Sequence, residues 1–101
     1  MQLLPQEVRD QLPALYATEE QPDPLVICKF FYPDFSWRWY AIEFAGSDIF
    51  FGWVDGDYPE LGYFSLAELS QTRGKLGCRI ERDCSFRPCR LSEVKKLRGR
   101  T

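Results

Sequence analysis

Carboxylates are the catalytic candidates that this 101-residue sequence offers most clearly, because it contains no histidine. That absence excludes a histidine general base, Ser-His and Cys-His nucleophiles, and imidazole metal ligands. The candidate acid–base groups are Glu43, which lies among aromatic residues, and the acidic cluster Asp55, Asp57 and Glu60. No catalytic partner stands at a recognisable spacing from any of them. We therefore predict that the protein is not an enzyme.

The four cysteines follow no familiar metal or redox pattern. Cys28, Cys78, Cys84 and Cys89 include no Cys-x-x-Cys pair, so a four-cysteine zinc site would be irregular, although it stays open. We expect free thiols, with Cys28 as a small core residue in a strand. The acidic segment after Asp55 lacks the length and ligand pattern of an EF-hand loop. We expect no cofactor and no metal.

The stretch from Trp37 to Asp55 predicts one long β-hairpin, with Gly46-Ser47 as a two-residue type II′ turn. That turn places Arg38 opposite Asp55 and Glu43 opposite Phe50. Side chains alternate across a strand, so the hairpin has two faces. The face that we predict as core carries Tyr40, Ile42, Phe44, Ile49, Phe51 and Trp53. The other face carries Trp37, Trp39, Ala41, Glu43, Phe50, Gly52 and Val54.

The second face of this hairpin is the candidate binding surface. Its small pair Ala41 and Gly52 leaves a shallow place between Trp39 and Phe50, where a helix of the chain, a partner or a ligand could approach. A helix of the chain is the expected occupant. Glu43 is harder to explain as structure. We expect it to pair with an arginine of the C-terminal third, Arg79 or Arg82, or otherwise to mark a binding surface.

The remaining elements predict a single α+β domain over residues 1–101, with a twisted antiparallel sheet of four or five strands and short flanking helices. Ser65 and Glu68 form a capping box that starts a helix ending near Arg73. Further helices are expected over 4–17, broken at Pro13, and over 91–98. Further strands or extended pieces are expected over 25–31, 61–64, 75–80 and 85–87.

Charge is unevenly distributed along the chain. Residues 1–70 carry three basic and twelve acidic side chains, whereas residues 71–101 carry ten basic and three acidic ones. Such asymmetry is typical of a nucleic-acid surface, or of two parts that attract each other within one fold, and we favour the second. No apolar run is long enough to cross a bilayer, and the first residues do not look like a signal peptide. We expect a cytoplasmic protein with no membrane partner.

Several segments carry a family resemblance over nearly the whole chain. They are Leu3-Leu4-Pro5, Gln11 to Thr18, Trp37 to Phe44, Phe50-Phe51-Gly52, Glu60 to Leu69, Ile80 to Asp83, Phe86-x-Pro88 and Leu91-Ser92-Glu93. In these segments the sequence resembles the bacterial family labelled domain of unknown function 2958. The resemblance implies a small stand-alone cytoplasmic protein carried on plasmids, conjugative elements and other mobile DNA. It implies no catalytic residues.

We predict a non-catalytic binding protein of a bacterial mobile element, whose partner is a host or element-encoded protein, a defence-system component being one candidate. The alternative is single-stranded nucleic-acid binding, with bases stacking on Trp37, Trp39 and Phe50 and phosphates meeting the basic C-terminal third. The oligomeric state stays open. The predicted binding residues are Trp37, Trp39, Glu43, Phe50, Asp55, Asp57, Glu60, Arg79 and Arg82.

Overall fold

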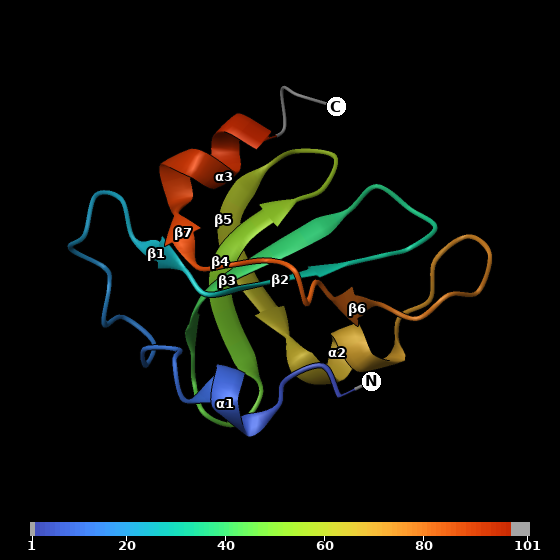
Figure 1. Ribbon diagram of the computed structural model, residues 1–101, viewed down its shortest axis with the longest axis horizontal. Helices are drawn as coiled ribbons and strands as arrows, with labels where there is room; N and C mark the ends of the chain where they lie inside the picture. The colour runs from blue at the N-terminus through green and yellow to red at the C-terminus, as the bar shows by residue number, and fades with distance from the viewer. Residues whose placement is uncertain (1, 98–101) are drawn as a thin grey trace.

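The centre of the fold is a five-stranded antiparallel sheet with strand order β5-β4-β3-β2-β6. Figure 1 shows the computed structural model. The structure describes residues 2–97. Its strands are β2 (Cys28–Phe31), β3 (Arg38–Phe44), β4 (Ile49–Asp55), β5 (Glu60–Ser65) and β6 (Glu81–Arg82). A separate two-stranded sheet pairs β1 (Leu25–Val26) with β7 (Cys89–Arg90). The helices are α1 (Gln6–Arg9), α2 (Leu66–Gln71) and α3 (Leu91–Leu97). The predicted α+β class is therefore confirmed.

The predicted hairpin is β3 and β4, and its register is confirmed only at its open end. Arg38 pairs with Asp55 and Ala41 with Gly52, as expected, but an irregularity between Ala41 and Glu43 then shifts the pairing by one residue. Glu43 therefore lies opposite Phe51 instead of Phe50. The two-residue turn is also wrong, because the Ala45 N–H bonds to the Ile49 carbonyl and residues 45–48 form the connection.

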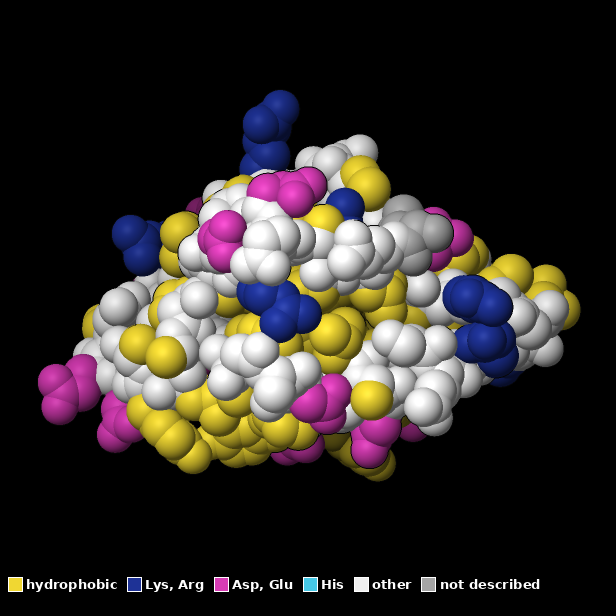
Figure 2. Space-filling view, turned by 90° about the horizontal axis from the view of Figure 1, so that it is seen from below, with side chains coloured by type: hydrophobic (Ala, Val, Ile, Leu, Met, Phe, Trp, Pro, Cys, Tyr) yellow, Lys and Arg dark blue, Asp and Glu magenta, His cyan; other side chains and the backbone are white. Residues whose placement is uncertain are grey.

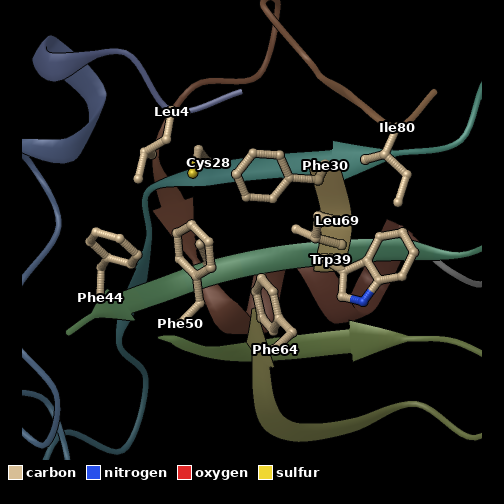
Figure 3. Close-up of a cluster of buried hydrophobic side chains, with 10 residues drawn as sticks. Leu4, Cys28, Phe30, Trp39, Phe44, Phe50, Phe64, Leu69 and Ile80 are labelled. Carbon is tan, nitrogen blue, oxygen red and sulfur yellow. The ribbon is translucent and has the colours of Figure 1, made fainter. Parts of the chain in front are cut away.

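The larger hydrophobic core lies on the hairpin face that the sequence predicts as the candidate binding surface, and not on the face predicted as core. Phe44 and Phe50 pack there with ring centroids 4.6 Å apart, and Phe64 stacks on Phe50 at 5.0 Å. Figure 3 shows these rings grouped with Phe30 and Leu69. Leu69 of α2 packs on this face, as expected of a helix of the chain, and so do Leu4 and Ile80, which lie outside the helices. The buried members of the core are Leu4, Cys28, Phe30, Trp39, Ala41, Phe44, Phe50, Phe64, Leu69 and Ile80.

The opposite face of the sheet holds a second, smaller core under α3. Tyr40 and Ile42 lie there with Leu91 and Val94 of the helix, and Trp53 packs at the margin. In Figure 1, α3 lies at the top of the molecule, whereas α1 and α2 lie at the bottom. Apolar side chains of β3 therefore point to both faces of the sheet. Leu69 of α2 packs on one face, and Leu91 and Val94 of α3 pack on the other.

The structure confirms some of the helices and extended pieces that the sequence predicts, and not others. Ser65 caps α2 by accepting a hydrogen bond from the Glu68 N–H at 3.2 Å, which confirms the helix start that the Ser65/Glu68 pattern predicted. The helix predicted over 4–17 is reduced to α1. The extended pieces predicted over 75–80 and 85–87 are not strands, and the short strands β6 and β7 follow them. The expected end of the last helix at residue 98 lies outside the described residues. None of the helices within residues 2–97 has the length and apolar character to cross a membrane.

Candidate functional site

Glu43 is buried, with 2% of its surface exposed, and anchors the loop before β1. Its Oε1 accepts a hydrogen bond from the Tyr16 N–H at 2.8 Å, and its Oε2 accepts one from the Thr18 N–H at 2.8 Å. The Thr18 hydroxyl donates a further bond to Oε2. Three donors thus satisfy a carboxylate that burial would otherwise destabilise. The irregularity between Ala41 and Glu43, which we call the β3 bulge, turns the Glu43 side chain toward this loop.

Tyr16 is held in a conformation that a tyrosine rarely adopts. Its φ is +71°, and the other positive φ values in the described chain belong to glycines. The side chain nevertheless stays 62% exposed and reaches toward Tyr63, which is 56% exposed. Burial raises the pKa of Tyr63, and the neighbouring hydroxyl of Tyr16 raises it further. Glu43 therefore holds a strained residue that presents an aromatic ring to solvent.

A groove of about 440 Å³ lies between this loop and the sheet, and we call it the Tyr16–Tyr63 groove. Phe51 and Leu61 complete its apolar walls, and the Phe51 and Tyr63 ring centroids are 5.2 Å apart. Its charged lining residues are Glu19, Glu43 and Lys95. Lys95 Nζ lies 4.8 Å from the centroid of the Trp53 ring. The groove is thus a mostly apolar surface with a few polar groups, as binding sites commonly are.

The acidic segment after β4 has a structural role that its sequence did not reveal. Asp57 Oδ1 accepts a hydrogen bond from Trp37 Nε1 at 3.3 Å. The Trp37 ring lies over Gly56, where an added Cβ would come within 2.9 Å of it. Asp57 and Glu60 are exposed, and Asp55 pairs in register with Arg38. The segment therefore fixes Trp37 and leaves its acidic side chains near the start of β5.

The predicted stacking surface is not present in this structure. Trp39 is only 7% exposed and Phe50 is fully buried, since both belong to the larger core. Trp37, which is partly buried, lies with its ring centroid 6.0 Å from that of Trp39. A base could not stack on Trp39 or Phe50 without opening the core.

The predicted partnership of Glu43 with an arginine is wrong. Arg82 donates from Nη1 to the carbonyl oxygens of Gln2 and Leu3, at 2.9 and 3.2 Å. Arg79 is exposed and forms an isolated β-bridge with Arg73. Arg82 lies on β6, at the opposite edge of the sheet from β5. Arg82 therefore lies away from Glu60, the predicted acidic residue on β5.

The four cysteines are free thiols. Cys28 lies in the larger core, as predicted, and burial raises the pKa of its thiol to about 12. Within residues 2–97, no three Cys, Asp or Glu side chains are grouped so that they could hold a metal ion.

Sequence reasoning missed Tyr16, Leu61 and Tyr63 as surface residues. A signal existed for the two residues in β5, because Leu61 and Tyr63 alternate with Gly62 and the buried Phe64. That alternation predicts that both point to one face of the strand. No sequence signal marks Tyr16, because its positive φ depends on hydrogen bonds to Glu43, 27 residues further along the chain.

The fold and the groove define a small α+β protein with an open antiparallel sheet and an exposed aromatic surface at one sheet edge. The chain belongs to the family described as "Protein of unknown function (DUF2958)", whose model matches residues 3–99. No curated protein matches the sequence. No solved structure matches it either.

Proposed function

We propose that this protein is a non-catalytic binding protein of a bacterial mobile element, and that it acts in the cytoplasm on a host or element-encoded protein. The observation that carries the proposal is the Tyr16–Tyr63 groove, with exposed aromatic side chains at its mouth. Exposed tyrosines are favoured at protein interfaces because they combine an apolar ring with a hydroxyl. A component of a defence system is one candidate partner, from the family context alone.

Two further features support binding over catalysis. The groove carboxylate of Glu43 is occupied by three hydrogen bonds within the chain, so it is not available as an acid or base. The apolar side chains at the surface are also grouped. In Figure 2 a hydrophobic area at the lower left has Asp and Glu side chains along its border. Grouped apolar surface with a charged margin is typical of interaction sites.

The test is capture of partners from a bacterial lysate by the tagged full-length chain, at low and high salt, with and without nuclease treatment. We expect a protein that stays bound after nuclease digestion and in high salt. Tyr63→Ser removes an aromatic ring from the groove and should reduce its capture. Tyr58→Ser is the matched control, because Tyr58 is 85% exposed and is not among the residues that line the groove.

Retention of nucleic acid alone, lost in high salt, would contradict the proposal and support phosphate-dominated binding. Absence of any retained protein would contradict it as well. Equal capture by the two tyrosine variants would show that the partner binds outside the groove.

A further inference from the structure

The geometry points to the outer edge of β5 as the binding site for an extended segment of another protein, which adds to the sheet as a sixth strand. The segment would carry alternating large apolar residues and would have lysine or arginine at its ends. This inference rests on the proposed function and specifies how the partner binds. Strand addition of this kind takes affinity from main-chain hydrogen bonds and specificity from pockets for alternate side chains.

The first argument is the direction of the main-chain groups of β5. Leu66 N donates to the Asp48 carbonyl at 2.9 Å, and β4 and β5 pair in regular antiparallel register from Ile49/Ser65 onward. Because hydrogen-bonded pairs alternate, the N–H and C=O groups of Leu61 and Tyr63 point away from β4. No strand within residues 2–97 pairs with that side of β5. The edge therefore presents donors and acceptors at the spacing of a strand.

The second argument is that a concave surface lies on each side of this edge. Side chains of an added strand point alternately to the two faces of the sheet. On one face they would meet the Tyr16–Tyr63 groove. On the other they would meet a hollow of about 300 Å³ lined by Trp37, Val54, Phe64 and Leu69, among others. Both hollows can take large apolar side chains.

The third argument is Gly62, in the middle of β5. A Cβ at this position would have nothing within 4 Å, and its φ is not positive. Its neighbour across the ladder, Gly52, is different, because a Cβ there would lie 1.9 Å from the Tyr40 carbonyl oxygen. Neither internal contacts nor backbone conformation requires a glycine at 62. A glycine within a strand often marks the close approach of another chain.

The fourth argument is charge, which selects the occupant. Glu60 begins β5, Glu68 lies just beyond its end, and Asp57 and Glu19 flank the edge strand and the groove, all of them exposed. Lys95 is the basic residue that lines the groove. Two copies of β5 paired antiparallel would bring the Glu60 end of one strand beside the Glu68 end of the other, which like charges disfavour. Basic residues at both ends of a partner segment complement this edge.

The experiment uses two phage-displayed libraries of ten-residue peptides with randomised centres, selected against the full-length chain. One library has two lysines at each end and the other has two glutamates. We expect binders from the lysine library, with large apolar residues at alternate positions. Selected peptides should also protect the Leu61 and Tyr63 amides of the wild-type protein from hydrogen exchange.

A matched pair of variants separates the contribution of the main-chain hydrogen bond at Leu61 from that of the leucine side chain. Leu61→Pro and Leu61→Ala both remove the leucine side chain, but only proline removes the outward N–H, and proline is tolerated at strand edges. We expect peptide binding to Leu61→Pro to be about tenfold weaker than to Leu61→Ala, the equivalent of one hydrogen bond. The exchange measurement on the wild type tests the same point if Leu61→Pro does not fold.

Binders from neither library, or equally from both, would overturn the inference, as would unchanged binding to Leu61→Pro or unprotected amides. If the wild type is a dimer in sedimentation equilibrium and Leu61→Pro is a monomer, the edge binds a second copy of this chain, and the inference is overturned as well. Lysate capture separates the two proposals. If wild type and Leu61→Pro retain the same protein equally, the proposed function stands and this site fails. If neither retains a protein, the proposed function fails.

Discussion

Glu43 links the β3 bulge to the shape of the groove, and its removal tests that link. Glu43→Ala leaves the main-chain N–H groups of Tyr16 and Thr18 without their buried acceptor. We expect a loss on the order of 3 kcal/mol in the free energy of unfolding, measured by urea titration, because charge-assisted hydrogen bonds are lost in a buried site. Glu43→Gln keeps one acceptor oxygen and should lose less. Equal stability of Glu43→Ala and wild type would contradict the anchoring role.

The strained backbone of Tyr16 gives a second test at a single position. Glycine adopts a φ of +71° without strain, so Tyr16→Gly should stabilise the folded state by about 1–2 kcal/mol. Glycine also loses more conformational entropy on folding, which costs about 0.5–1 kcal/mol. We expect a free energy of unfolding about 0.5 kcal/mol higher than wild type in urea titration. Ala17→Gly is the control, because Ala17 has no positive φ and should lose about 0.5–1 kcal/mol. A loss in both variants of the same size would show that Tyr16 is not strained.

The hairpin of β3 and β4 shows how far sequence reasoning reaches for an element. The alternation of β-formers predicted its existence and the pairing of Arg38 with Asp55, because those signals are local. The bulge and the turn depend on distant groups. Glu43 faces the Tyr16 loop, and Asp48 bonds to Ser65 and Ala67. The Ala45 N–H bonds to the Ile49 carbonyl, so the connection is longer than the two-residue turn that Gly46-Ser47 predicts. One shifted residue moved Glu43 and Phe44 to the opposite faces, so that Phe44 joins Phe50 in the larger core.

Two glycines on neighbouring strands make opposite predictions. Gly52→Ala places a methyl group against the main chain of β3, since its Cβ would lie 1.9 Å from the Tyr40 carbonyl oxygen. We expect a loss of about 3 kcal/mol or more in the free energy of unfolding, because the main chain must shift. Gly62→Ala meets open space and should be neutral or gain up to about 1 kcal/mol. Thermal unfolding followed by circular dichroism compares them, and similar melting temperatures would refute the close approach at Gly52.

The junction between β5 and α2 has a stability that depends on pH. The Ser65 hydroxyl donates to Asp48 Oδ2 at 2.7 Å and the Ala67 N–H donates to Oδ1 at 2.8 Å, and together they hold the pKa of Asp48 below its ordinary 3.8. A lowered pKa in the folded state means that the stabilisation is complete above pH 3.8 and is lost as the pH falls through the folded-state pKa. The difference in unfolding free energy between wild type and Asp48→Asn should therefore shrink below pH 3.8. Urea titrations at several pH values test this, with Gly62→Ala as a control that has no titrating group. A difference that stays constant would contradict it.

At the level of the whole molecule, the acidic and basic parts of the chain meet at Asp23, whose pKa is lowered by hydrogen bonds from Ser92 and by the nearby charges of Arg90 and Lys95. Asp23, from the acidic part, accepts hydrogen bonds from Ser92 N and Oγ at 2.8 Å at the start of α3, and Arg90 donates to the Asp23 carbonyl. The salt bridge of Lys29 with Asp83, at 3.6 Å, also joins the two parts, but it pairs a basic residue of the acidic part with an acidic residue of the basic part. The sequence supported attraction between the two parts in general. It could not supply the particular contacts, because each joins residues more than fifty positions apart, and neither could it reveal the Tyr16–Tyr63 groove.

The two cores share one sheet, and this arrangement predicts that they unfold together. Successive residues of β3 alternate between them, Trp39 and Ala41 in the larger core and Tyr40 and Ile42 under α3, so neither core can open while the other keeps its strand. Trp39 and Trp53 report on the two cores separately.

The test uses two variants in a Trp37→Phe background. Adding Trp53→Phe leaves Trp39 as the only tryptophan, and adding Trp39→Phe instead leaves Trp53. In each variant we expect the urea midpoint from fluorescence to coincide with the midpoint from far-ultraviolet circular dichroism. A Trp53 midpoint at lower urea than the dichroism midpoint would show that the layer under α3 opens by itself. In that case the groove residue Lys95, which lies over Trp53, would belong to a separately unfolding unit.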